Sequence, residues 1–166
     1  MRASTQAAIT IDRPPLVVWN HATDITTLPK MFVGWGPIPA VKKVEVIKGE
    51  PMTPGMKQRT TTVDGRVIDE QILTVRKPEY FDYQLLKGFG FPFTLFVRMG
   101  GGSWTFTPKN SGTMIRWEYY FELTSLLAYP VGAMLVKFFW KNAMKAYLRE
   151  LKKYTESLIA IIKEEK

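Results

Sequence analysis

The sequence predicts an α+β fold in which a curved, seven-stranded antiparallel sheet wraps around one long C-terminal helix. Three observations indicate this fold. Apolar and polar residues alternate over residues 41–122, with turn residues between the runs, whereas the last forty residues switch to helical periodicity. No linker or internal repeat divides the 166 residues, so one domain is expected over 1–166, with a core at about 5–163.

The chain is expected to open with a strand and two short helices. Apolar and polar side chains alternate over residues 7–12, which predicts the first strand. Two prolines end this strand and precede a short helix that begins at Leu16, because proline is tolerated in a first helical turn. A second short helix is expected to run toward Lys30, with Thr23 or Asp24 as its N-cap.

Six further strands are expected, and the short turns between them predict antiparallel neighbours. Asp64-Gly65 is a strong hairpin signal, because a type I′ turn needs two positive φ angles. The run Gly100-Gly101-Gly102 is expected to form a β-bulge in the sixth strand. The predicted ranges are 41–48, 56–63, 66–76, 79–87, 93–107 and 112–122.

The closing helix is expected at about 128–163. At about 100° per residue, its apolar side chains from Val136 onward fall on one face and most lysines on the other. That apolar face is expected to pack against the sheet. The first two turns are apolar all round and need a cover. Three covers are possible: the 88–98 loop, an anionic bilayer into which Phe138 inserts, or a second copy of the chain.

Composition excludes several kinds of chemistry. The absence of cysteine excludes thiol catalysis and thiolate metal sites, and a single histidine, His21, excludes a multi-histidine site. No metal and no cofactor are therefore expected. His21 is expected to be exposed to solvent or to act as a local cap of its short helix. No signal peptide or spanning segment is found, so we expect a cytoplasmic protein that can be peripheral to a membrane.

The net charge of +8 is concentrated near the C-terminus. Residues 137–166 hold eight Lys or Arg and four Glu, which is +4 of the total. Such a charge is typical of nucleic-acid binding, but the chain has no recognition motif, so nucleic acid is not an expected partner.

Strand parity gives the candidate ligand-binding residues. Lys57 and Arg59 are expected to face outward, which turns the residues between and after them inward. Bulky aromatics and a few polar groups on a concave face are typical of an apolar pocket, although ordinary core packing is the alternative for each. The candidates are Gln58, Thr60, Tyr83, Trp104, Phe106, Trp117, Tyr119, Trp140, Met144 and Tyr147.

One carboxylate and one loop are further candidates. Glu70 lies in a strand whose two faces the pattern does not distinguish, and an inward Glu70 would be a weak candidate for a general base. The Gly- and Phe-rich segment 88–93 is interpreted as a lid, a membrane contact, or a hairpin folded back on the core. The lid or membrane residues are Phe89, Phe91, Phe93, Phe138, Lys137, Lys141 and Lys145.

A family resemblance rests on scattered motifs. These are Ile9-Thr10-Ile11 leading into Pro14-Pro15, Val18-Trp19, Asp24 with Leu28-Pro29, Pro54-Gly55-Met56, the Thr113–Trp117 strand and the closing helix. With them the chain resembles the START-like (helix-grip) superfamily over roughly residues 5–158, most closely its polyketide cyclase/dehydrase-type (SRPBCC) branch. Met31-Phe32 departs from the tryptophan usual in the family. The resemblance implies a deep cavity for a hydrophobic ligand and no shared catalytic residues.

The expected function is binding, transport or sensing of a hydrophobic small molecule: a lipid, a quinone or a polyketide-like compound. The first alternative is a cyclase or dehydratase, a lyase-type enzyme that uses a cavity tyrosine or carboxylate. The second is a helper module that contacts a protein or an anionic membrane surface. An inward Glu70 with a hydrogen-bond partner would favour the enzyme, and an unbroken apolar cavity with a mobile mouth would favour the carrier.

Overall fold

The computed structural model describes residues 1–88 and 93–164, without the side chains of Phe93 and of residues 158–164. One antiparallel sheet has the strand order β1-β7-β6-β5-β4-β3-β2, which confirms the predicted fold class. Its strands are β1 (Arg2–Ile11), β2 (Val41–Lys48), β3 (Lys57–Thr62), β4 (Val67–Arg76), β5 (Tyr80–Lys87), β6 (Val97–Lys109) and β7 (Gly112–Leu123). The helices are α1 (Pro15–Thr23), α2 (Leu28–Met31), the 3-10 helix η1 (Phe93–Leu95), α3 (Tyr129–Met134), the π-helix η2 (Leu135–Trp140) and α4 (Lys141–Glu164).

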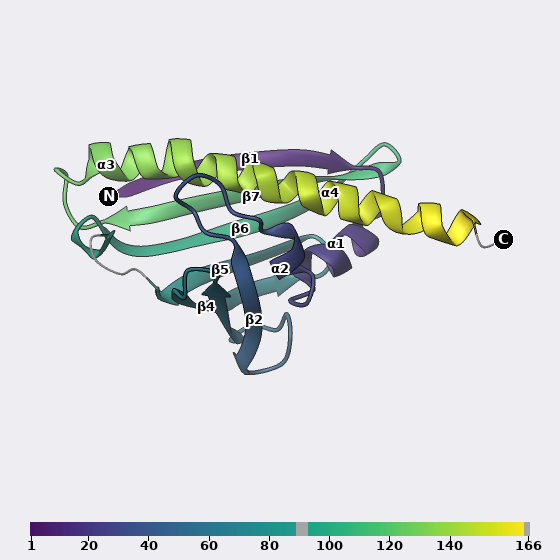
Figure 1. Ribbon diagram of the computed structural model, residues 1–166, viewed down its shortest axis with the longest axis horizontal. Helices are drawn as coiled ribbons and strands as arrows, with labels where there is room; N and C mark the ends of the chain where they lie inside the picture. Colours follow the sequence, from purple (N-terminus) through teal and green to yellow (C-terminus); the bar gives the residue numbers. More distant parts are fainter. Residues whose placement is uncertain (89–92, 165–166) are drawn as a thin grey trace.

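The long helix lies on one side of the curved sheet. Figure 1 shows α3, η2 and α4 following one another beside β1 and β7, while α1 and α2 lie toward the C-terminal half of α4. The helix buries Val136, Met144 and Leu151 against the sheet, which is the face that the periodicity predicts. None of the helices in residues 1–88 and 93–164 has the length and apolar character needed to cross a bilayer.

The first strand begins earlier than predicted, at Arg2 rather than at residue 7. It pairs with β7 from Arg2 opposite Glu122 to Ile11 opposite Thr113, at the edge of the sheet. Its first inward residue is Ala3, a small side chain that carries little hydrophobic signal. The backbone pairing extends a strand that the side-chain pattern alone does not reveal.

The predicted N-cap of the second helix is wrong. The carboxylate of Asp24 accepts hydrogen bonds from the amide and the hydroxyl of Thr26, at 2.8 and 2.7 Å, and so forms a local turn. Helix α2 begins only at Leu28 and has no side-chain cap at Thr27. The hydroxyl of Thr27 instead donates to the backbone oxygen of Asp24 at 2.9 Å.

The predicted bulge at the glycine run is also wrong. Gly100, Gly101 and Gly102 pair in regular register with β7, and the irregularity of β6 lies between Val97 and Met99. The glycines serve close packing: a Cβ at Gly102 would lie 2.8 Å from the hydroxyl oxygen of Tyr83 and 2.6 Å from the backbone oxygen of Glu118. Gly102 therefore leaves the space that the Tyr83 ring occupies.

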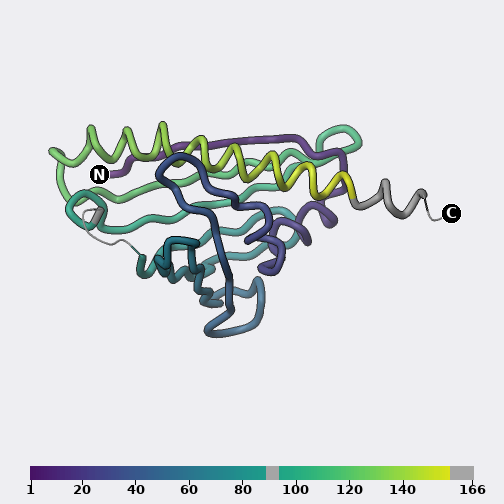
Figure 2. The backbone as a smooth tube through the Cα atoms, viewed as in Figure 1, coloured from purple at the N-terminus to yellow at the C-terminus, as the bar shows by residue number. Residues whose placement is uncertain are grey.

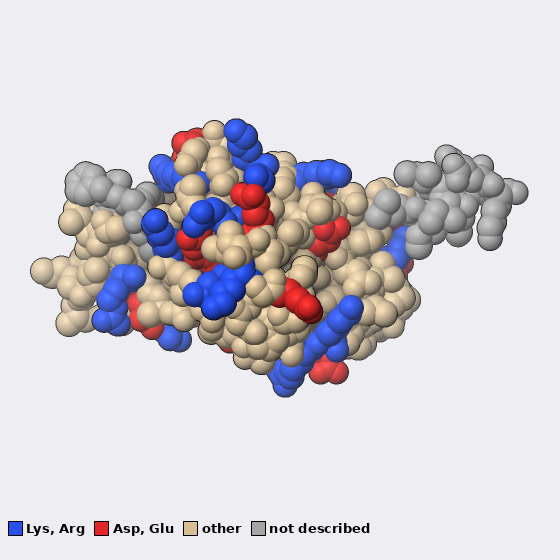
Figure 3. Space-filling view, turned by 90° about the horizontal axis from the view of Figure 1, so that it is seen from below, with Lys and Arg blue, Asp and Glu red and all other residues tan. Residues whose placement is uncertain are grey.

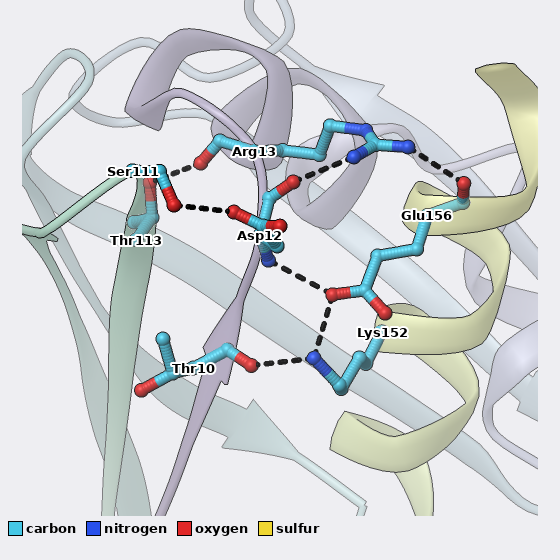
Figure 4. A network of polar contacts seen from close by, with 7 residues as sticks. All are labelled: Thr10, Asp12, Arg13, Ser111, Thr113, Lys152 and Glu156. Carbon is cyan, nitrogen blue, oxygen red and sulfur yellow. Dashed lines mark hydrogen bonds and ion pairs between the residues drawn. The ribbon is translucent and has the colours of Figure 1, made fainter.

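A polar network fixes the C-terminal part of α4 to the end of β1 (Figure 4). One carboxylate oxygen of Glu156 accepts hydrogen bonds from the Asp12 amide at 2.8 Å and from Lys152 Nζ at 2.6 Å. Lys152 also donates to the Thr10 backbone oxygen at 2.9 Å, and Arg13 donates to the Glu156 backbone oxygen at 2.7 Å. These contacts hold the helix in place across the sheet at this end.

Candidate functional site

A pocket of about 240 Å³ lies between the sheet and the long helix. Strands β3 to β7 supply one side and η2 and α4 supply another, while the remaining lining comes from α1, residues 25–41 and the β2–β3 connection. Most lining side chains are apolar or aromatic, while a few polar groups project among them. This combination is typical of a site for a small, largely apolar molecule.

Stacked aromatic rings form the sheet side of the pocket. The rings of Trp104 and Trp117, on neighbouring strands, stack with centroids 4.7 Å apart, and Phe81 stacks on Trp104 at 5.7 Å. Tyr147 from α4 meets both tryptophans edge-on, at 5.8 and 5.7 Å. Such edge and stacked contacts stabilise a rigid aromatic surface.

The helix side of the pocket carries two buried donors without a partner. Within the described part of the chain, neither Nε1 of Trp140 nor the hydroxyl of Tyr147 has a hydrogen-bond partner. Both residues line the pocket, and Tyr147 is only 2% exposed. Because an unpaired buried donor is unfavourable, both groups are suited to donate to an acceptor atom of a bound molecule.

Glu70 faces the pocket from β4. Its Oε2 accepts a 2.7 Å hydrogen bond from Nε2 of Gln58, its cross-strand neighbour on β3. Burial raises the pKa of Glu70 above its ordinary value, although the bond from Gln58 opposes this shift. A carboxyl group with a raised pKa can take up or release a proton nearer neutral pH than an exposed one.

Two further tyrosines stay protonated in this environment. The hydroxyl oxygen of Tyr83 accepts a 3.1 Å hydrogen bond from Nε1 of Trp117. Burial raises the pKa of Tyr83 and of Tyr119 well above the usual value, and the nearby Glu70 raises both further. Their hydroxyl groups therefore remain neutral donors at physiological pH.

The structure brings most of the predicted ligand-binding residues together. Phe106 and Met144 lie instead in the packed core, where Phe106 contacts Trp19 with ring centroids 5.1 Å apart. The predicted residues that line the pocket are Gln58, Thr60, Tyr83, Trp104, Trp117, Tyr119, Trp140 and Tyr147.

The predicted lid or membrane residues are spread over several places. Phe89, Phe91 and the side chain of Phe93 lie outside the described residues. Phe138 is 55% exposed and meets Trp35 edge-on at 5.7 Å. Lys137 and Lys145 are exposed and Lys141 is half-buried, all on the outer side of the helix.

Several pocket residues were not predicted. Ala22 from α1, Phe32, Ile38 and Pro39 from the following loop, and Met52 from the β2–β3 connection close one side of the pocket. Turn residues surround most of them, so no periodicity marks an inward side. The one sequence signal for these pocket residues is that apolar residues recur among the glycines and prolines that end the second short helix.

His21 lies outside the pocket. Its Nδ1 lies 3.2 Å from the hydroxyl oxygen of Thr155, and its ring meets Tyr154 edge-on. Burial lowers the pKa of His21, and the charge of Asp24 partly opposes that shift. The histidine therefore connects α1 to α4, away from the pocket.

Comparisons with known proteins agree with this architecture. The chain is similar to an aromatase/cyclase from a Streptomyces species (13% identity, TM-score 0.73, covering 96% of each chain). It is also similar to a point mutant of norcoclaurine synthase from Thalictrum flavum (14% identity, TM-score 0.71, covering 95% of this chain and 96% of that one). The structure of Ara h 8.0201 aligns at 16% identity and TM-score 0.71, over 95% of this chain and 99% of the other.

At these identities the structural likeness establishes the fold alone. No curated protein matches the sequence. A family model described as "Polyketide cyclase / dehydrase and lipid transport" matches residues 2–156, which is nearly the whole chain and agrees with the START-like resemblance. The chain belongs to this polyketide cyclase / dehydrase and lipid transport family.

Proposed function

We propose that the protein binds a hydrophobic, ring-containing small molecule in the pocket between the sheet and the long helix. The observation that carries this proposal is the aromatic wall of Phe81, Trp104 and Trp117, which faces a space of about 240 Å³. Transfer of apolar ligand surface from water to these rings supplies the binding free energy, at ~25 cal/mol per Å².

Polar groups set the orientation of the ligand. Tyr147 and Trp140 offer donors from the helix, while Glu70 and Tyr83 lie on the sheet side. A molecule with an apolar ring system and an oxygen acceptor, such as a quinone or a polyketide-like compound, satisfies both surfaces. A carrier or sensor needs no more than this arrangement.

Native mass spectrometry of the purified protein, followed by organic extraction, tests the proposal first. A hydrophobic molecule bound near one-to-one supports it. Anilinonaphthalene sulfonate then serves as a probe for Ile68→Trp, which fills the pocket from β4, and for Val67→Trp, which adds the same ring on the outer face of that strand. We expect Ile68→Trp to lose probe binding and Val67→Trp to keep it. Equal probe binding by the two variants would refute the pocket as the binding site.

A second candidate is an acid–base enzyme, because Glu70 points into the pocket with Gln58 as a hydrogen-bond partner. In a dehydration, the Glu70 carboxylate would remove the proton beside a substrate carbonyl. A carbon–carbon double bond then forms as the β-hydroxyl group leaves, and the proton that Glu70 has taken up passes to this group, which departs as water. Tyr147 would donate to the carbonyl oxygen on which negative charge develops.

The two candidates differ in the effect of Glu70→Gln. A dehydratase loses turnover of a β-hydroxyketone in this variant while binding of the substrate persists. A carrier keeps its binding and shows no turnover in either form of the protein.

Among known structures of this fold, a norcoclaurine synthase is in complex with dopamine and hydroxybenzaldehyde, which are two small aromatic molecules.

A further inference from the structure

One end of the molecule exposes apolar side chains around the start of the long helix. Leu127 is 91% exposed and Leu126 is 74% exposed in the β7–α3 connection. Phe138 and Met134, one helical turn apart, are 55% and 53% exposed. We call this surface the apolar end; its residues are Trp35, Leu95, Leu126, Leu127, Met134 and Phe138.

The parts of the apolar end lie next to one another. The Thr124 amide donates to the Phe96 backbone oxygen at 3.0 Å, and the Thr124 hydroxyl donates to the Leu95 backbone oxygen at 2.8 Å. The η1 segment therefore borders the β7–α3 connection. Figure 2 shows the loop that carries Trp35 crossing the helix, where Trp35 meets Phe138.

The charged side chains near this end are mainly basic, and Glu122, which precedes the β7–α3 connection, is already paired with Arg2 and Arg98. The sequence has no Asp or Glu over residues 25–44, 83–117 or 123–149, which include every residue of the apolar end. Lys137, Lys141 and Lys145 follow at four-residue spacing, and none forms an ion pair with a described residue. In Figure 3 the end at the left is mainly uncharged, with Lys and Arg side chains and an acidic side chain at its border.

We propose that the apolar end docks on an anionic lipid bilayer. Leucine and phenylalanine side chains insert among the acyl chains, while the lysines contact the phosphate headgroups. A second copy of the chain is a poorer partner. A two-fold interface would place the same patch of both copies together, and this patch offers no carboxylate to pair with the lysines.

Docking would also bring part of the pocket lining close to the bilayer. Leu135, between Met134 and Phe138, lines the pocket, as do Ile38 and Pro39 in the loop that carries Trp35. An apolar ligand could then exchange between the pocket and the lipid without crossing water. The docking proposal itself does not depend on what the pocket binds.

Vesicle flotation tests the proposal. The full chain is mixed with vesicles of phosphatidylcholine alone or of phosphatidylcholine with phosphatidylglycerol, at low and at physiological salt. We expect binding to the anionic vesicles only, and weaker binding as salt rises. The double variant Leu126→Ser/Leu127→Ser is expected to lower partitioning more than about tenfold. Lys137→Gln/Lys141→Gln is expected to lower it about 25-fold, from about fivefold per lysine.

Matched controls come from the opposite end of the molecule. Leu16→Ser removes a 50% exposed leucine from α1, and Lys109→Gln removes an exposed lysine from the end of β6. Both are expected to bind vesicles as the parent protein does. Circular dichroism confirms that each variant is folded.

Three results would overturn the proposal. One is no binding to anionic vesicles at low salt by the folded parent protein. Another is equal binding by the leucine double variant and its Leu16→Ser control. The third is a dimer of the parent protein, seen by light scattering, that becomes a monomer in the leucine double variant, because the apolar end would then be a protein interface.

Discussion

Nε2 of Gln58 lies 2.7 Å from Oε2 of Glu70, and the two side chains share the pocket face of the β3–β4 pair. A carboxyl group in this position is held among apolar rings, so its charged form is disfavoured and its pKa is raised. The pair therefore gives the pocket one group whose proton occupancy depends on pH.

Glu70→Gln is expected to stabilise the protein at neutral pH. A raised pKa means that the folded state holds a proton which the unfolded state has released, so the free energy of unfolding falls as pH rises above about 4.5. The glutamine side chain of the variant does not titrate, so the free energy of unfolding does not fall in this way. The side chain can still form a hydrogen bond with Gln58. The melting temperature of the variant should match that of the parent protein near pH 4 and exceed it increasingly toward pH 7.

Thermal melts over this pH range make the comparison, with Glu118→Gln as the control. Glu118 is an exposed carboxylate on β7, and the curve of this variant should run parallel to that of the parent protein. Parallel curves for Glu70→Gln as well would contradict a raised pKa for the buried Glu70.

Two tyrosines of the pocket are expected to respond to the same substitution with opposite signs. Tyr147→Phe removes a buried hydroxyl that has no partner among the described residues, and should stabilise the free protein by about 1 kcal/mol. Tyr83→Phe removes the acceptor of Trp117 Nε1, and should destabilise it by about 1–2 kcal/mol. Urea unfolding measures both, and a shift in the same direction for the two variants would refute the distinction.

Much of the fold could be predicted from the sequence, because it follows from local patterns. Regular alternation set the faces of β7, on which Ile115, Trp117 and Tyr119 are buried as the pattern indicates. The helical period likewise identified the buried face of α4. Asp24 gave a wrong prediction because aspartate is favoured both at helix N-caps and in local side-chain turns, such as the one it forms with Thr26. The glycine run gave a wrong prediction because the close contact of Gly102 with Tyr83 depends on a residue that is distant in the sequence.

The face of Glu70 could not be predicted for a physical reason. The pairing of β4 with β5 skips Leu73 between Ile72 and Thr74, so Leu73 is an extra residue in β4. Ile68, Glu70 and Ile72 face the pocket before this point, whereas Val75 packs against the core after it, so one alternating pattern does not describe the whole strand. The loop side of the pocket was missed because its residues, such as Ile38, belong to no periodic element.

Gly102→Ala is expected to destabilise the protein by about 2 kcal/mol or more. The added Cβ would lie 2.6 Å from the Glu118 backbone oxygen and 2.8 Å from the Tyr83 hydroxyl, so the strand or the ring must move. Near-UV circular dichroism should change together with the urea midpoint. Gly65→Ala is the control: its Cβ meets no atom within 4 Å, and only its φ of +85° opposes the substitution, at about 1 kcal/mol.

The polar network at the end of α4 gives a prediction that depends on pH. Burial alone would raise the pKa of Glu156, but hydrogen bonds from the Asp12 amide and from Lys152 outweigh it and lower the pKa. For a carboxylate with a lowered pKa, the stabilising contribution is present above the unfolded value and is lost as pH falls through the folded one. Glu156→Ala should therefore cost about 1–3 kcal/mol at pH 7 and progressively less in acid.

Urea unfolding at pH 7 and in acid tests this sign against Glu150→Ala. Glu150 forms an exposed ion pair with Lys153 at 2.7 Å on the same helix, and such pairs contribute at most about 0.5 kcal/mol. If Glu156→Ala lowers the free energy of unfolding no more than Glu150→Ala does, the helix is held by its apolar face alone. A larger loss that disappears in acid would show that the Glu156 carboxylate fastens α4 to the end of β1.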